Sequence, residues 1–253
     1  MLDESLAYKV SAVHRLEPRA RIIASMFLSF GTALSHRFDI LGLYFIVSAA
    51  LVFTASLSWH EVWGRLKPLL WFVVMIWIFL PLSFEGEIIW QYGWVKVSFA
   101  GVRLCMEITL KSVTILLVFT ALVATMTVAT IGYGLHRLNF PEKLTFLLLM
   151  TYRYIYVIRD EYHRLLRAAR FRGFVPKTNL HSYRTFAYLA GMLFVRASFR
   201  AQRVYRAMVC RGFRGRFRTL DVYRLNGIDY LFIILCTLCA GILLLFEYYR
   251  IFL

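Results

Sequence analysis

The sequence lacks the short motifs on which most nucleotide and metal chemistry depends. It has no G-x-x-x-x-G-K-[ST] phosphate-binding loop, so we expect no ATP hydrolysis by that mechanism. Its six histidines are far apart and form no H-x-x-E-H or H-x-x-x-H pair, so none has the spacing of a metal site. It also has no nucleophile elbow. The sequence therefore predicts no enzyme, and no cofactor or metal site in this chain.

Cysteine is scarce, with four residues at positions 105, 210, 236 and 239. Cys236 and Cys239 form a C-x-x-C pair inside the continuous apolar run 234–246. A redox or metal-binding pair is one interpretation, and small residues filling a membrane helix is the favoured one. The cysteines predict no disulfide framework.

Apolar residues are in excess: 60% of the chain is hydrophobic, 17% is aromatic, and the mean hydropathy is +0.63. A soluble domain is nearer to half apolar. Several runs approach the roughly 20 residues that cross a bilayer. They lie at about 21–36, 38–57, 69–84, 108–132 and 229–247. The sequence predicts an all-α, multi-pass protein of the cell membrane, with about five to six membrane helices and two long cytoplasmic or interfacial helices.

The connections between these runs differ in charge. Residues 59–68 combine tryptophans with basic side chains, which is typical of the membrane interface, and residues 85–107 are the least cationic connection and are expected outside. Few ionisable groups fall within the runs. Lys111, near the start of the fourth, is expected to extend to the interface. The membrane part therefore predicts a scaffold, because charged residues usually mark an ion path through a transporter.

The basic charge is concentrated in one segment. The chain carries a net charge of +16, and residues 159–224 hold sixteen Lys and Arg against three acids, which gives 16 − 3 = +13. The positive-inside bias places such a segment in the cytoplasm. Counting 144–158 as a span would place the basic segment outside the cell. That run is therefore interpreted as the apolar half of a long interfacial helix. We predict membrane helices in 1–134, a cytoplasmic arginine-rich coupling-helix region in 135–226, and a membrane helix in 227–253.

Two long helices in this region are predicted to end alike. The sequences "RAARFRGF" and "RAMVCRGF" both read Arg-Ala-x-x-x-Arg-Gly-Phe, 206 − 167 = 39 residues apart. Gly173 and Gly212 are expected to stop the helices in a left-handed conformation. Capping and a favourable helix dipole would explain one such end. Two matched ends favour docking to a partner present in two copies, through pairs Arg167/Arg172 and Arg206/Arg211. On the second helix, Arg196, Arg200 and Arg203 follow i, i+4, i+7 spacing and share one face.

These motifs resemble the transmembrane coupling (T) component of an energy-coupling-factor ABC transporter. The family carries two Ala-Arg-Gly signatures, which here read Phe171-Arg172-Gly173 and Cys210-Arg211-Gly212. "HRLEPRARII" resembles the entry motif of the family, and "YRTFAYLAGMLFVRASFRAQRVYRAM" is similar to the cobalt- and nickel-type (CbiQ-like) members.

The resemblance implies two kinds of protein partner in addition to the lipid bilayer. Two cytoplasmic ABC ATPase subunits would bind ATP and receive the helix ends at Arg172, Gly173, Arg211 and Gly212, with Arg167 and Arg206. A membrane S component, held by the apolar faces of the long helices, would bind cobalt or nickel. No cofactor in this chain and no nucleic acid is implied.

Three other interpretations stay open from the residues alone. A stand-alone secondary transporter would show inverted repeats and broken or charged spans. A membrane-tethered binder of nucleic acid or anionic lipid would use the arginines as a phosphate-binding surface. In the third, the arginines only orient the protein in the membrane.

Overall fold

A computed structural model of the chain describes residues 11, 13–83, 88–92, 95–213 and 226–252. The chain divides into two compact units. We call Met1–Gly134 with Val222–Leu253 the membrane unit, and Leu135–Asp221 the arginine-rich unit. The cytoplasmic position of the middle region stays a prediction. The acids of the expected external connection at 85 and 87, and the arginines at 214–224, lie outside the described residues.

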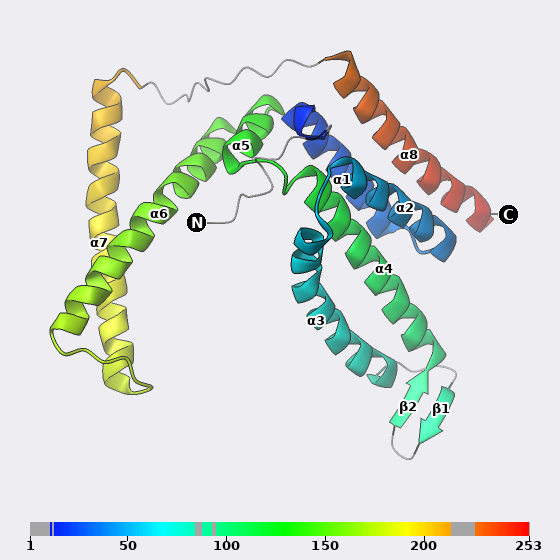
Figure 1. The fold of residues 1–253 in the computed structure, drawn as a ribbon, viewed down its shortest axis with the longest axis horizontal. Helices are drawn as coiled ribbons and strands as arrows, with labels where there is room; N and C mark the ends of the chain where they lie inside the picture. The colour runs from blue at the N-terminus through cyan, green and yellow to red at the C-terminus, as the bar shows by residue number, and fades with distance from the viewer. Residues whose placement is uncertain (1–10, 12, 84–87, 93–94, 214–225, 253) are drawn as a thin grey trace. The chain divides into compact units, whose positions relative to one another are not determined.

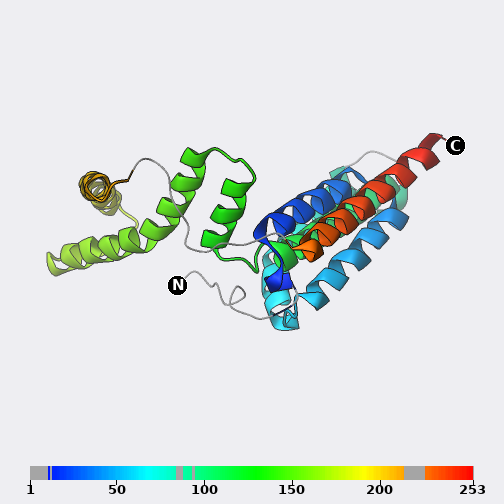
Figure 2. The same ribbon diagram turned by 90° about the horizontal axis from the view of Figure 1, so that it is seen from above.

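The membrane unit is built from helices and one hairpin (Figures 1 and 2). Its elements are η1 (Val13–Arg15), α1 (Pro18–Leu34), α2 (Phe38–Thr54), α3 (Trp59–Ser83), β1 (Ile88–Tyr92), β2 (Val95–Ser98), α4 (Phe99–Leu122), α5 (Val128–Arg137, which runs into the second unit) and α8 (Gly227–Phe252). The antiparallel β1–β2 hairpin joins α3 to α4. Helix α4 packs against α1, α2 and α3, and α1 also packs against α8.

Three helices in the described part of the chain are long and apolar enough to cross a membrane: α3, α4 and residues 227–247 of α8. Helix α2 is apolar but shorter. Their outward faces carry large exposed side chains such as Trp71 and Phe53, which a bilayer would cover. The prediction of an all-α integral membrane protein is confirmed, with the two-stranded hairpin as an addition.

Two predicted spans were placed wrongly. The third begins at Trp59 instead of 69, because Pro68 lies inside a continuous helix, which membrane helices tolerate. The fourth runs from Phe99 to Leu122 instead of 108–132. Glu107 does not break it, since Lys111 one turn later lies 2.8 Å from its carboxylate. The hydroxyl of Thr127 accepts the N–H of Thr130 at 3.1 Å, which begins α5 as a separate helix.

The core of the membrane unit joins three helices at Tyr44. Its ring is 1% exposed, and its hydroxyl donates to the carbonyl of Ala240 on α8 at 3.0 Å. Gly31 of α1 lets the ring approach, because a Cβ built at Gly31 would lie 2.5 Å from the Tyr44 hydroxyl. A small residue is therefore required at this crossing, as is common where membrane helices pack closely.

The arginine-rich unit is a pair of long helices, α6 (Glu142–Phe171) and α7 (Leu180–Cys210), that run in opposite directions (Figure 1). The apolar segment 144–158 is part of one continuous α6, as predicted. Pro141 is the N-cap residue of α6. Helix α7 begins at Leu180, because the side chain of Asn179 accepts the Ser182 N–H at 2.9 Å and caps the helix.

Candidate functional site

The two Arg-Gly ends adopt the same backbone geometry. Arg172 and Arg211 are the C-cap residues, with φ and ψ of −89° and 15° in one and −89° and 12° in the other. The glycines that follow are left-handed, with φ of 84° at Gly173 and 80° at Gly212. The predicted helix stops are confirmed, because such positive φ values are favourable for glycine.

Both ends close with the same pair of hydrogen bonds. After α6, the Phe174 N–H donates to Ala169 at 3.1 Å and the Gly173 N–H to Arg170 at 3.0 Å. After α7, Phe213 donates to Met208 at 3.0 Å and Gly212 to Val209 at 2.9 Å. This pattern is the Schellman motif, which satisfies the last carbonyls of each helix.

The phenylalanine after each glycine packs on the other helix. The ring of Phe174 lies 5.5 Å from that of Phe186 near the start of α7. The ring of Phe213 lies 5.7 Å from that of Phe146 near the start of α6. Each helix end is therefore fixed by its partner helix, and the two ends lie at opposite ends of the α6–α7 pair.

The arginines of both ends are exposed. They are Arg167, Arg172, Arg206 and Arg211. Since their backbones are held by the Schellman motifs and the phenylalanine contacts, the guanidinium groups are presented from a rigid base. A planar guanidinium fork in that position suits carboxylate or carbonyl acceptors on a protein partner.

Glu161 joins α6 to the arginine stripe of α7. Arg196 donates to its carboxylate, and the Nη2 of Arg200 lies 3.7 Å from it. Arg164, one turn away on α6, lies 3.8 Å from the same group. The hydrogen bond from Arg196 is the main cause that lowers the pKa of Glu161. The carboxylate therefore stays charged over the physiological range, although its side chain is only 12% exposed.

Two grooves lie between α6 and α7, one on each side of Glu161. The first, of about 460 Å³, is lined mainly by apolar side chains from 146–158 of α6 and 197–208 of α7. The second, of about 540 Å³, is lined by residues 165–174 at and just beyond the end of α6 and by 181–196 of α7, and includes Arg172 and Gly173. The first groove offers an apolar surface, and the second reaches one of the two matched ends.

A buried polar cluster ties one end of the membrane unit together. Arg21, 3% exposed, donates from Nε to the carbonyl of Leu122 at 3.0 Å and from Nη2 to Thr125. The Glu17 N–H donates to the Asp229 carboxylate at 2.9 Å. The "HRLEPRARII" segment thus links α1 to the end of α4 and the start of α8.

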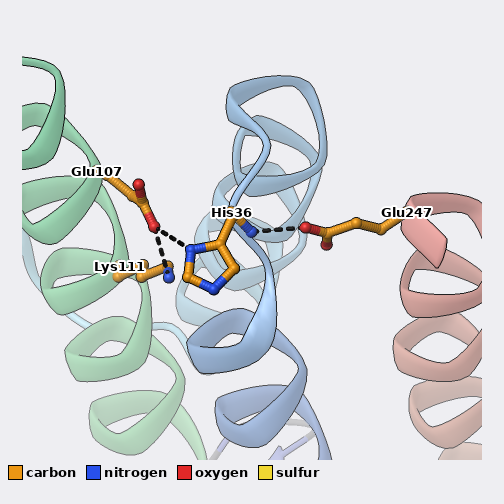
Figure 3. A network of polar contacts seen from close by, with 4 residues as sticks. All are labelled: His36, Glu107, Lys111 and Glu247. Atoms are coloured by element: carbon orange, nitrogen blue, oxygen red, sulfur yellow. Dashed lines mark hydrogen bonds and ion pairs between the residues drawn. The ribbon is translucent and has the colours of Figure 1, made fainter. Parts of the chain in front are cut away.

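A second polar cluster lies where α1 ends, on the side where α8 also ends (Figure 3). The Nδ1 of His36 lies 2.8 Å from Glu107, and the His36 N–H donates to Glu247 at 2.6 Å. Lys111 pairs with Glu107 and is 15% exposed, and its extension to the interface stays a prediction. The contacts of His36 with Glu107 and Glu247 join segments far apart in the sequence, so spacing along the chain did not reveal them.

The described residues contain no group of three or more His, Cys, Asp or Glu side chains placed to hold a metal ion. Cys236 is buried in α8, and Cys239 is partly exposed. Both are free thiols within an apolar helix.

Comparison with known proteins decides the family. Residues 9–220 match the CbiQ family of cobalt transport proteins. The chain belongs to this family. The predicted relationship to the T component of energy-coupling-factor transporters is confirmed, as is the multi-pass membrane location.

Curated members of the family are similar along most of the chain. The energy-coupling factor transporter transmembrane protein EcfT of Bacillus subtilis is 27% identical over 230 residues, which cover 85% of this chain and 87% of its own. EcfT of Brevibacillus brevis is 28% identical over 221 residues, covering 81% and 82%. EcfT of Ruminiclostridium cellulolyticum is 24% identical over 217 residues, covering 81% and 80%.

Proposed function

We propose that this CbiQ-family chain is the coupling subunit of an energy-coupling-factor importer and that Arg172 and Arg211 dock two ATPase subunits. The observation that carries the proposal is the pair of equal helix ends, each with an exposed arginine on a Schellman motif. Two copies of one ATPase need two copies of one contact, because identical surfaces bind equivalent groups. Gly173 and Gly212 hold the backbone, and Arg167 and Arg206 add charge one turn or more before each end.

In this mechanism the chain transmits motion and carries out no chemistry. The ATPase subunits bind ATP and close around it, which moves the two docked helix ends relative to each other. The long helices carry that movement to a membrane S component that holds the substrate. The apolar groove between α6 and α7, lined by Phe146, Met150 and Ile155 among others, gives that S component a surface for its own helices.

The proposed substrate is a cobalt or nickel ion, carried by the S component. The family description and the similarity of residues 183–208 to the metal-type members support this choice. The test is a gentle detergent purification of the chain from its native membranes, with the co-purifying proteins identified by mass spectrometry. Uptake of labelled cobalt and nickel by vesicles holding the purified complex then identifies the ion. Uptake of neither ion would overturn the metal assignment.

Charge reversal at the two ends tests the docking itself. Arg172→Glu with Arg211→Glu should remove the ATPase subunits from the purified chain while the chain stays in the membrane. Arg159→Glu, the same change on α6 away from its ends, is the matched control and should keep them. Retained ATPase subunits in the double variant would refute the docking role.

The same experiments separate the other interpretations. If the arginines only orient the protein, the double variant Arg172→Lys with Arg211→Lys should keep full ATPase binding. If each arginine docks through its planar guanidinium fork, the same variant should bind the ATPase subunits more weakly. A secondary transporter would move substrate as the purified chain alone. A phosphate-binding surface would bind DNA or anionic vesicles with steep salt dependence.

A further inference from the structure

Glu161 and Arg196 mark the point where α6 and α7 cross. The residues of α6 that line the first groove end at Ile158, and those that line the second begin at Leu165. On α7 the change from one groove to the other falls between Arg196 and Ala197. Glu161 therefore lies between the two grooves along α6, and its partner Arg196 borders the second groove.

The two docking ends are levers on opposite sides of this crossing. Along α6, Arg172 lies 172 − 161 = 11 residues beyond Glu161. Along α7, Arg211 lies 211 − 196 = 15 residues beyond Arg196. At about 1.5 Å per residue, the arms are roughly 16 Å and 22 Å long. A rotation about the crossing therefore moves Arg172 and Arg211 along arcs whose lengths are set by these two arms.

Most of the surface that lines the grooves is apolar or aromatic, and such contacts set no single rotation, because the hydrophobic effect is non-directional. The Glu161 carboxylate differs, since a charge-assisted hydrogen bond has a preferred direction and length. Its second oxygen faces Arg200, which lies one turn from Arg196 on the same face of α7. A turn-sized shift of α7 along α6 would exchange one arginine for the next and keep the carboxylate paired.

The geometry points to Glu161 as a positioning residue that fixes the pivot of the two docking arms, with Arg196 and Arg200 as its alternative partners. This inference rests on the proposed function for its consequence in transport. Its structural part, the fixed angle between α6 and α7, concerns this chain alone.

The first measurement uses the full chain alone in nanodiscs. Spin labels are placed at Ala168 and Ala207, both exposed, after the native cysteines are changed to alanine. Glu161→Gln should broaden the distance distribution between the labels, and Glu161→Asp should restore much of it. Glu161→Arg with Arg196→Glu should also narrow it again. Asp160→Asn, the neighbouring exposed acid, is the control and should change nothing.

The second measurement uses the complex with its ATPase and S components. Glu161→Gln should leave the subunits assembled and ATP hydrolysis intact, while substrate transported per ATP falls by roughly fivefold or more. A residue needed only for folding would instead lower assembly and both activities together. Unchanged distances and an unchanged ratio in Glu161→Gln would overturn the pivot. Failure of the wild-type chain to bind any ATPase would overturn the proposed function and leave the distance measurement to decide the pivot.

Discussion

Arg21 of α1 donates from its Nε to the carbonyl of Leu122, the last residue of α4, at 3.0 Å. The guanidinium is 3% exposed, and its Nη2 also donates to Thr125. A helix C-terminus is a favourable site for a cation, because its last carbonyls lack partners within the helix. The arginine of the "HRLEPRARII" segment thus caps a helix whose end lies 101 residues away in the sequence.

Replacement of Arg21 by methionine should destabilise the membrane unit. The change leaves the Leu122 carbonyl without this buried donor, and a hydrogen bond to a charged group contributes about 1.5–3 kcal/mol. The thermal midpoint in detergent should fall by roughly 4–10 °C. Arg37→Met is the control: Arg37 pairs with the exposed Asp39 at 3.2 Å, and such surface pairs contribute little. Equal midpoints for the two variants would contradict the capping role.

Gly31→Ala should destabilise through Tyr44. The added methyl group meets the tyrosine hydroxyl, and overpacking a close-packed core costs about 1–3 kcal/mol. Tyr44→Phe removes the clashing oxygen. In a double-mutant cycle on thermal stability, the loss in the double variant should therefore be smaller than the sum of the losses in Gly31→Ala and Tyr44→Phe. Gly42→Ala, where an added Cβ has no neighbour within 4 Å, should be neutral or stabilising. Simple additivity would show that the two residues are not coupled.

Gly173→Ala and Gly212→Ala should each loosen one helix end. A left-handed conformation costs an L-residue about 1–2 kcal/mol, which competes with the two closing hydrogen bonds. Faster amide exchange at residues 173–174 or 212–213 and weaker ATPase retention are expected. Asn visits this conformation more readily, so Gly173→Asn should lose less. Gly191→Ala, inside α7, is the control. Exchange rates in the alanine variants that match the wild type would contradict this account.

The pairing of Lys111 with Glu107 predicts non-additive substitutions. Lys111→Met leaves the partly buried Glu107 carboxylate with His36 as its remaining partner among the residues that the structure describes, so it should destabilise strongly. Lys111→Met combined with Glu107→Gln removes both charges and should recover most of the lost thermal stability. A double variant that is less stable than Lys111→Met alone would show that the two charges do not compensate each other in the folded chain.

The angle between α6 and α7 should resist acid until well below neutral pH. Because the pKa of Glu161 is lowered in the folded chain, its pairing is fully present above the unfolded value of about 4.3. It is lost only as the pH falls through the folded pKa of Glu161. The distribution of distances between labels at Ala168 and Ala207 should stay constant from pH 8 to 5 and broaden only at pH values below the unfolded pKa of glutamate. Broadening of the distance distribution between pH 7 and 5 would show that a group other than Glu161 fixes the angle between α6 and α7.

Local patterns in the sequence were enough to predict the long helices and their ends. The 144–158 run continuing into α6 and the glycine stops at 173 and 212 depend on residues close together in the chain. The spans were harder, since residues 59–68 and 85–107 were interpreted as connections, whereas α3 begins at Trp59 and α4 at Phe99. A proline within a membrane helix and a charge paired one turn away are both tolerated, and neither is visible as such in composition.

The sequence by itself determined that this is a membrane protein with one strongly basic segment and two alike helix ends, because hydropathy, charge and glycine stops are local properties. The docking role of Arg172 and Arg211 was suggested by repetition and still awaits its test. Only the tertiary structure decided the partners of Arg21, Glu107 and Glu161. Each pairs with a group 35 to 104 residues away, and the direction in which two packed helices present their side chains cannot be obtained from spacing along one of them.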